Sequence, residues 1–453
     1  MDKNYYITTP IYYVNDKPHI GHAYTSIACD VLARFKRLDG YSVKFLTGTD
    51  EHGQKVEKAA KSQNKSPLEY ANFISKDFKS LTKTLNLSND DFIRTTEKRH
   101  ILAAQSLWSK LYENKHIYLD KYSGWYALRD EAFYSEKEII NGKAPSGADV
   151  SWVEEESYFF DLSKWQDKLL EFYDKNPNFI LPKSRMNEVK SFVKGGLRDL
   201  SVSRTSFEWG VKVPNNDKHI MYVWLDALTN YLSAIGYPDT LENEYVNFWP
   251  ADIHMVGKDI LRFHAVYWPA FLMAAELPLP KRIFAHGWWT NEGKKISKSE
   301  GNVIDPLEII GSYGLDQIRY FLLREVPFGS DGDFSKTALL ARINGDLSND
   351  LGNLCQRVIS MIYKNCNGFI PRKCEKLNDR DIIFYNKSNA LYEKVKNEID
   401  KQSFHEAIKL IWAMISDANK YIDEQAPWKL KKSDKNRMND VLWILADTIR
   451  KIA

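Results

Sequence analysis

The first fifty residues of this sequence constrain the fold most, because strand-like and helix-like patterns alternate there. Residues 5–14 are rich in β-branched and aromatic side chains, which predicts a buried strand. The tetrad His19–His22 follows, and apolar residues then recur at helical spacing over residues 23–38. Residues 43–46 predict a second strand. A strand, a helix and a strand in this order are typical of a doubly wound parallel sheet, in which ligands bind at the carboxyl ends of the strands.

Two motifs, far apart in the chain, suit the binding of a nucleoside triphosphate. His19-Ile20-Gly21-His22 lies at the expected strand-to-helix turn, where imidazoles can contact phosphates and a glycine lets a ligand approach the backbone. Residues 295–299 read Lys-Ile-Ser-Lys-Ser, and such a loop can neutralise charge as pyrophosphate leaves. Alone, the histidines more often cap a helix, and the lysine loop is more often a solvated turn. Their occurrence together, in this order, favours a nucleotide site.

The pattern changes along the chain in a way that predicts several domains. Residues 115–206 are rich in aromatics and short strand-like pieces, which suggests an inserted domain. We expect strands of the parallel sheet to resume at His219–Leu225 and Asp252–Val256. From residue 338 onward long amphipathic helices dominate, which predicts a helical bundle. The expected divisions are 1–114, 115–206, 207–276, 277–337 and 338–453.

Composition excludes several classes of protein. The 453 residues are 43% hydrophobic and 27% charged, and apolar runs such as Phe271–Ala275 are too short to span a bilayer. There are four cysteines and no secretion signal, so we expect a cytoplasmic protein without disulfides. From Ala341 to the end, 20 basic residues face 15 acidic ones, whereas the net charge of the whole chain is +3. This excess is a mild indication that the C-terminal part binds a polyanion, although a solvated helical surface explains it equally well.

These motifs, with Thr47–Gly53, Tyr222–Ala227 and Gly257–Ile260, resemble those of the class I aminoacyl-tRNA synthetases, and most closely the methionine-specific members. The resemblance runs over essentially the whole chain. It implies an α/β fold: a Rossmann-type doubly wound parallel sheet split by the inserted domain, a linker fold with the lysine loop, and an all-α anticodon-binding bundle. It also implies that the chain activates methionine with ATP to methionyl-adenylate and pyrophosphate, then transfers methionine to the 3′-terminal adenosine of tRNA(Met).

The resemblance assigns roles in adenylation to both motifs. His19, His22, Lys295 and Lys298 are the implied catalytic residues, with the lysines on the departing pyrophosphate. The implied ATP site adds Gly21, Lys258, Asp259 and Ser297. Mg²⁺ is expected to arrive with ATP, without a dedicated protein cage. No partner other than tRNA(Met), methionine and ATP is implied, and we expect a monomer.

A second implied site binds methionine, whose flexible thioether suits an apolar slot lined by aromatic rings. Asp50 is expected to pair with the substrate ammonium group, and His264 and Tyr13 to offer polar atoms near the sulfur. The implied residues are Pro10, Ile11, Tyr13, Asp50, Trp224, Ala227, Leu228, Tyr231, Ile260, His264 and Trp268. Leu228 departs from the family, in which proline is common at this position. Without the resemblance, the aromatic members of this set would more often be ordinary core.

A third implied site reads the anticodon. Asn353 and Arg357 are four residues apart and therefore share one helix face. By resemblance they bond base edges, while Trp428, which follows Pro427, stacks on an unstacked base. Taken by itself, Trp428 has even odds of being a core residue of the bundle.

Many relatives carry a zinc knuckle of paired Cys-x-x-Cys units in the inserted domain. The matching positions here are Ala127, Asp130, Ala144 and Gly147, which offer no thiolate. We therefore expect no structural zinc.

Three other readings stay open at this point. The first is a class I synthetase for another apolar amino acid. The second is a non-catalytic tRNA-binding paralogue, against which the intact His19, His22, Lys295 and Lys298 argue. The third is a small nucleotidylyltransferase, which would not need the inserted and C-terminal domains.

Overall fold

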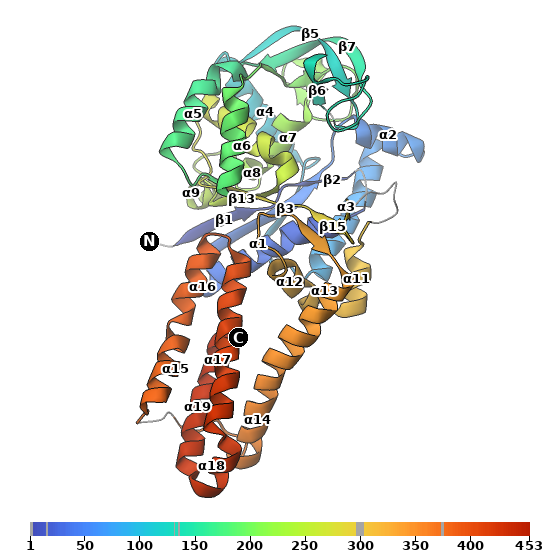
Figure 1. Ribbon diagram of the computed structural model, residues 1–453. Helices are drawn as coiled ribbons and strands as arrows, with labels where there is room; N and C mark the ends of the chain where they lie inside the picture. The colour runs from blue at the N-terminus through green and yellow to red at the C-terminus, as the bar shows by residue number, and fades with distance from the viewer. Residues whose placement is uncertain (1–2, 15–16, 131, 135, 296–302, 373–375) are drawn as a thin grey trace. The chain divides into compact units, whose positions relative to one another are not determined.

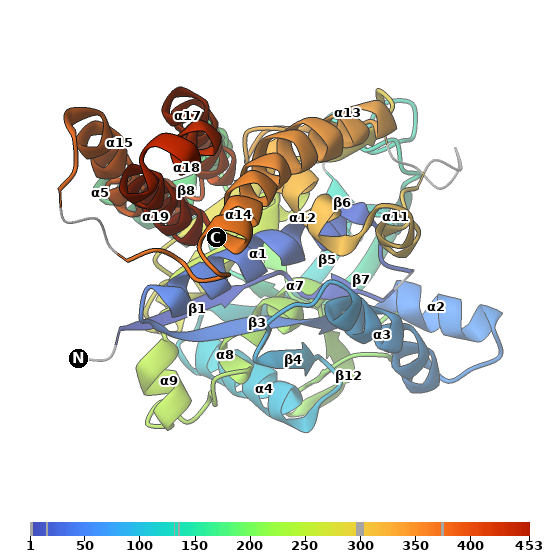
Figure 2. The same ribbon diagram turned by 90° about the horizontal axis from the view of Figure 1, so that it is seen from below.

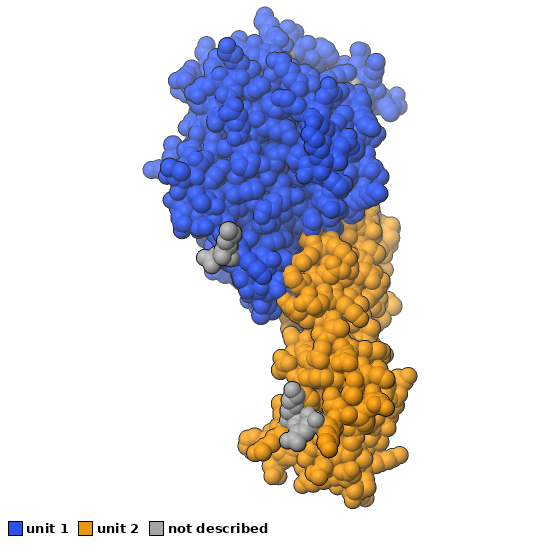
Figure 3. All heavy atoms as spheres, turned by 90° about the vertical axis from the view of Figure 1, so that its left-hand side faces the viewer, with its two compact units in different colours: residues 1–286 blue, residues 287–453 orange. Residues whose placement is uncertain are grey.

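A computed structural model describes residues 3–14, 17–130, 132–134, 136–295, 303–372 and 376–453. The chain forms two compact units, residues 1–286 and 287–453 (Figure 3). The sequence-based boundaries at residues 115, 207, 277 and 338 divide these units more finely and stay a prediction.

A seven-stranded sheet, in which every pair is parallel, forms the centre of the first unit (Figure 1). Its strands follow the order β2-β3-β1-β13-β14-β8, with β4 also paired to β3. Their bounds are β1 Asn4–Thr8, β2 Tyr12–Tyr13, β3 Ser42–Asp50, β4 Asp91–Arg94, β8 Ile180–Leu181, β13 Ile253–Gly257 and β14 Ile283–His286. Such all-parallel sheets need helices on their faces, and their strands are accordingly buried.

Helix α1 (Ile20–Leu38) follows the first two strands and packs on β1, β3 and β13, with β1 and β3 beneath it in Figure 2. Its buried face carries apolar residues at helical spacing, including Ile27 and Leu32. The other helices of this unit are α2 Gln54–Ser62, α3 Pro67–Thr84, α4 Lys98–Glu113, α5 Gln166–Lys175, α6 Lys183–Lys194, α7 Val223–Leu228, α8 Asn230–Ser233, α9 Asn243–Phe248 and α10 Trp268–Ala274. Large buried rings such as Trp108, Tyr231 and Trp268 belong to one core cluster of the unit.

Two antiparallel sheets interrupt the parallel one in sequence. A four-stranded sheet has the order β6-β5-β7-β9, and a three-stranded sheet the order β10-β12-β11. Their strands are β5 Ile117–Ala127, β6 Ala132–Tyr134, β7 Ser151–Phe160, β9 Leu200–Ser201, β10 Ser203–Arg204, β11 Lys212–Val213 and β12 Asn216–Met221. The long β5–β7 pair therefore lies where the sequence predicts an inserted domain.

The second unit begins with a small sheet and continues as helices. The sheet order is β16-β15-β17, with β15 Trp289–Asn291, β16 Lys294–Lys295 and β17 Gly332–Phe334. The helices are α11 Pro306–Tyr313, α12 Leu315–Arg324, α13 Lys336–Ala341, a π-helical segment Arg342–Gly352, α14 Asn353–Asn365, α15 Asp379–Asn389, α16 Leu391–Asp400, α17 Phe404–Gln425, α18 Pro427–Ser433 and α19 Lys435–Ile452. Helices α14, α15, α17 and α19 share one apolar core, as expected of a bundle.

Two sequence-based expectations about strands are wrong. Residues 5–14 form two strands, β1 and β2, rather than one, because Pro10 between them has no backbone N–H to donate to a ladder. Residues 219–225 do not rejoin the parallel sheet. Their first part belongs to β12, which pairs antiparallel with β10 and β11, and α7 begins at Val223.

None of the helices in the described part of the chain is both long enough and apolar enough to cross a membrane.

Candidate active site

The start of α1 is capped by two histidine rings, each of which accepts a hydrogen bond from a backbone amide. His19 is the N-cap residue, and its Nδ1 accepts from the backbone N–H of Gly21 at 3.1 Å. The backbone N–H of His19 in turn donates to Nδ1 of His22 at 3.0 Å. The two rings lie 3.9 Å apart, centroid to centroid. Amide groups at a helix start have no partner within the helix, and here the two imidazoles supply acceptors for them.

This arrangement fixes where the protons of both rings lie. An Nδ1 that accepts an N–H bond carries no proton, so each neutral ring must carry its proton on Nε2. Burial lowers the pKa of His19 and lowers that of His22 still further, with the neighbouring His19 ring contributing. Both rings are therefore neutral near pH 7. Each keeps one Nε2–H donor, which suits the binding of phosphate oxygens at the positive end of a helix.

The His19 ring leaves little room for a side chain at Gly21. A Cβ at residue 21 would lie 3.0 Å from Cε1 and 3.1 Å from Nδ1 of His19. The ring would have to give way by a few tenths of an ångström to accommodate it. The structure thus adds a second reason for this glycine to the expected close approach of adenine.

Other residues predicted for the site gather at the same carboxyl edge of the sheet. Tyr13 and Asp50 face one another in register on the parallel strands β2 and β3, and Asp50 is buried. Lys258 and Asp259 follow the end of β13, and Asp259 is close enough to His19 to oppose the lowering of its pKa. Gly257 leaves room for Asp259, because a Cβ there would lie 2.4 Å from Oδ1 of the carboxylate.

The residues predicted to hold the methionine side chain form one aromatic and apolar cluster. The ring of Trp224 stacks on Phe263 at 3.6 Å, and that of Tyr231 lies 6.0 Å from Trp268. Leu228, Tyr231 and Trp268 are buried in the core cluster of the unit, and Ile11, Trp224 and Ile260 pack against it partly buried. Ala227 and Pro10 are also buried. Six of the predicted residues therefore lie in or against one cluster, and Phe263, which sequence reasoning did not single out, stacks on Trp224.

His264 and Tyr231 form a hydrogen-bonded pair with a definite direction. Nδ1 of His264 lies 2.9 Å from the carbonyl oxygen of Ile260, which can only accept. His264 is neutral, since burial lowers its pKa to about 4, so Nδ1 carries its one proton. The Tyr231 hydroxyl, 2.7 Å from Nε2, must then donate to the ring. Because the Tyr231 proton points to His264, the polar group that this pair can offer is a lone pair on the Tyr231 oxygen, which accepts hydrogen bonds.

The lysine motif of the second unit is only partly described. The backbone of Lys295 pairs with Thr290 in the β15–β16 hairpin. Ser297 and Lys298 lie outside the described residues, so their predicted roles stay predictions.

In the helical unit, two of the predicted anticodon residues lie together. The Arg357 guanidinium lies over the Trp428 ring at 5.3 Å from its centroid and forms an ion pair with Asp423. Trp428 is 38% exposed, in contrast to a core residue. Pro427 begins α18, and Asn353 is exposed at the start of α14, one turn before Arg357.

The four zinc-knuckle positions form two turns without a thiolate. The amide of Asp130 donates to the Ala127 carbonyl at 3.2 Å, and that of Gly147 donates to Ala144 at 2.8 Å. Ala127 and Ala144 are buried in a small apolar cluster, and Ser146 of the second turn donates to the Asp130 carboxylate. In the described part of the chain, no three His, Cys, Asp or Glu side chains are placed to hold a metal ion.

Sequence reasoning gave no role to a buried cluster behind the site. The Asp226 carboxylate lies between two imidazoles, with Nδ1 of His52 at 2.6 Å and Nε2 of His100 at 2.7 Å. His52 and Asp226 lie in two of the motifs that carry the resemblance, and their place in these motifs could have identified them. His100 lies outside all of them.

Comparison with known proteins agrees with this geometry. The model of the family described as tRNA synthetases class I (M) matches residues 5–150 and 137–359. The methionine–tRNA ligase of Rickettsia felis is 58% identical over 100% of this chain and 89% of its own length, and that of Brucella suis is 53% identical over 99% and 88%. Mycobacterium tuberculosis methionyl-tRNA synthetase in complex with methionyl-adenylate superposes with a TM-score of 0.97 at 51% identity, over 99% of this chain and 90% of that one. Its apo form gives a TM-score of 0.90 at 48% identity, over 100% and 88%.

Proposed function

The chain belongs to the methionyl branch of the class I tRNA synthetases, and we propose that the site described above is where it performs the two steps of a methionine–tRNA ligase. In the first step methionine and ATP form methionyl-adenylate and pyrophosphate. In the second, methionine passes to the 3′-terminal adenosine of tRNA(Met). The observation that carries the assignment is the pair of fixed Nε2–H donors on His19 and His22, at the sheet edge that also holds Asp50 and the aromatic slot.

Adenylation requires donors to the phosphates of ATP. A carboxylate oxygen of methionine attacks the α-phosphorus, and the bond between that phosphorus and the bridging oxygen to the β-phosphate breaks, so that pyrophosphate leaves with both bonding electrons. His19 and His22 donate to phosphoryl oxygens through Nε2 and stabilise the charge that develops there. Lys295, Ser297 and Lys298 hold the pyrophosphate, and Lys258 and Asp259 bind ATP, which brings Mg²⁺ as its counter-ion.

Methionine is recognised at both of its ends. The Asp50 carboxylate, at the carboxyl end of β3 and opposite Tyr13, pairs with the α-ammonium group. The thioether lies among the cluster of Trp224, Tyr231 and Trp268, where a polarisable sulfur packs well on rings. Pro10, Ile11, Tyr13, Ala227, Leu228, Ile260 and His264 complete this slot.

The helical unit selects the tRNA. Trp428 is exposed enough to stack on an anticodon base, and Arg357 and Asn353 present donors on the adjacent helix face. Arg357 must exchange its bond to Asp423 for one to RNA when the tRNA binds. We further propose that the enzyme acts as a monomer in the cytoplasm.

The test is to measure both steps with the purified protein. Methionine-dependent exchange of pyrophosphate into ATP reports the first step, and charging of a tRNA(Met) transcript with labelled methionine reports the second. We expect both, with charging lost when the CAU anticodon is altered. Exchange without any charging would leave an adenylating enzyme but overturn the tRNA assignment.

A further inference from the structure

Asp226 is a buried carboxylate with an imidazole on each side. Its side chain is 1% exposed, that of His52 is 6% exposed, and that of His100 is fully buried. Oδ2 lies 2.6 Å from Nδ1 of His52, and Oδ1 lies 2.7 Å from Nε2 of His100. A carboxylate can only accept, so each facing nitrogen must carry a proton.

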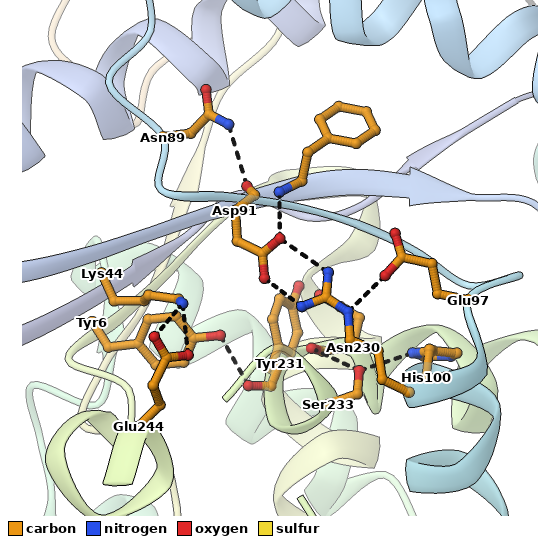
Figure 4. A network of polar contacts seen from close by, with 12 residues as sticks. Tyr6, Lys44, Asn89, Asp91, Glu97, His100, Asn230, Tyr231, Ser233 and Glu244 are labelled. Atoms are coloured by element: carbon orange, nitrogen blue, oxygen red, sulfur yellow. Dashed lines mark hydrogen bonds and ion pairs between the residues drawn. The ribbon is translucent and has the colours of Figure 1, made fainter. Parts of the chain in front are cut away.

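Asp226, His52 and His100 form a hydrogen-bonded trio, and further contacts lead from His100 back to the wall of the methionine slot. Nδ1 of His100 lies 3.0 Å from the Ser233 hydroxyl, which lies 3.1 Å from the Asn230 carbonyl oxygen (Figure 4). The Asn230 side chain donates to the carbonyl of Ala227 at 2.6 Å. Ala227 directly follows Asp226, so the chain of contacts closes on itself.

The trio and this closed chain of contacts together join the two halves of the predicted methionine site. His52 is two residues after Asp50, which is assigned to the substrate ammonium group. Asp226 stands in α7 between Trp224 and Ala227, which are assigned to the slot for the side chain. The neighbouring Tyr231 carbonyl also accepts from the Tyr6 hydroxyl at 2.9 Å, which holds α8 to strand β1 (Figure 4).

The charge of Asp226 follows from its contacts. Burial alone would raise the pKa of Asp226, but the two imidazoles hold it well below its usual range, so the carboxylate is ionised. A buried carboxylate needs hydrogen-bond donors, and here each of its two oxygens accepts one from an imidazole.

We propose that Asp226, hydrogen-bonded to both His52 and His100, is a positioning residue for amino-acid activation. It holds the Asp50–His52 segment against α7 and α8, so that the ammonium site and the side-chain slot keep one fixed spacing. This inference rests on the proposed function. None of the three residues needs to touch the substrate, and the effect should be specific to methionine because the ATP-binding histidines lie on a different helix, α1.

The test compares three variants in methionine-dependent pyrophosphate exchange. Asp226→Asn removes the charge and one acceptor at nearly constant volume, and His100→Gln keeps a donor for Asp226 but removes the ring that also contacts Ser233. His116→Asn is the control, because His116 also pairs with a buried carboxylate in the same unit, at 3.1 Å from both oxygens of Asp161. We expect KM for methionine to rise at least tenfold in Asp226→Asn and less in His100→Gln. KM for ATP should stay near the wild-type value, and the control should change neither KM.

Three results would overturn the proposal. An unchanged KM for methionine in His100→Gln and Asp226→Asn would show that the trio does not position the site. Equal increases in KM for methionine and for ATP would show a merely structural role. A ¹H NMR spectrum of the wild type without downfield-shifted ring N–H signals from His52 and His100 would contradict the hydrogen bonds to Asp226. That measurement needs no activity, so absent exchange in the wild type would reject the proposed function and leave these hydrogen bonds still testable.

Discussion

The backbone amide of His19 donates to Nδ1 of His22, while Nδ1 of His19 accepts from the amide of Gly21, so two backbone amides at the start of α1 fix the tautomers of both rings. The sequence left capping and phosphate binding as competing explanations of this pair. The structure allows both, because capping uses the Nδ1 atoms and leaves the Nε2–H groups as donors.

Because Nδ1 of His19 caps the helix and Nε2–H is the donor for phosphate, His19→Asn should slow adenylation without lowering stability. Asparagine is a favourable N-cap residue and can accept from Gly21 as His19 does, so the melting temperature should be unchanged. The Nε2–H donor is lost, and adenylation should slow by about 10²–10³-fold. Stopped-flow or exchange kinetics with a parallel thermal melt measure both. Normal kinetics would show that His19 only caps the helix.

Gly21→Ala should lower the rate of adenylation, although it introduces a residue that favours helix formation. Alanine normally stabilises a helix relative to glycine. Here its Cβ would lie 3.0 Å from the His19 ring, so the ring must give way by a few tenths of an ångström, and the rate should fall by less than the about 10²-fold that a 1 Å misplacement can cost. Exchange assays at saturating methionine should show the loss as a lower kcat or a higher KM for ATP. Unchanged kinetics would mean that the ring can move without consequence.

Stability should fall as the pH drops from about 6.5 toward 4, and His264 should account for part of this loss. Its pKa is lowered by burial to about 4 in the folded state, so between these values the unfolded chain binds a proton that the folded chain does not. Its contribution is complete above pH 6.5 and amounts to about 3 kcal/mol across the window. His264→Asn keeps a donor for Ile260 and should flatten the dependence. Denaturant unfolding at several pH values checks this, and equal slopes in both proteins would contradict it.

Trp428→Ala should affect the second step alone. Loss of base stacking should cost about 1–3 kcal/mol, seen as a higher KM for tRNA or slower transfer. Tyr363→Ala is a suitable control, since Tyr363 is an exposed aromatic of the same helical unit. Pyrophosphate exchange should be unaffected by either change. A loss in both steps would indicate that Trp428 supports the fold instead.

The purified protein should contain no stoichiometric zinc, and chelators should not unfold it. Ala127 and Ala144 pack together where thiolates would stand, and the contact of Ser146 with Asp130 joins the two turns. Elemental analysis measures this directly. One tightly bound zinc ion per chain would require ligands other than those four positions.

Patterns local in sequence predicted the first strand-helix-strand unit, the placement of His19–His22 at its turn, and the helices of the C-terminal bundle. The break at Pro10 was visible in the sequence but was outweighed by the apolar run around it. The antiparallel pairing of β12 depends on β10 and β11, which periodicity cannot identify. The pairing of Asp226 with His100 joins residues 126 positions apart, and no spacing rule connects them. The methionine slot is predicted by the family resemblance and stays a prediction, because its aromatic residues alone look like ordinary core.

The central claim is that this site selects methionine for adenylation. It is tested most directly by measuring ATP–pyrophosphate exchange with each of the twenty amino acids at equal concentration. The account predicts strong exchange with methionine and far weaker exchange with leucine or isoleucine, whose branched side chains fit an aromatic slot for an unbranched thioether poorly. Preferred exchange with another amino acid, or none with methionine, would contradict it.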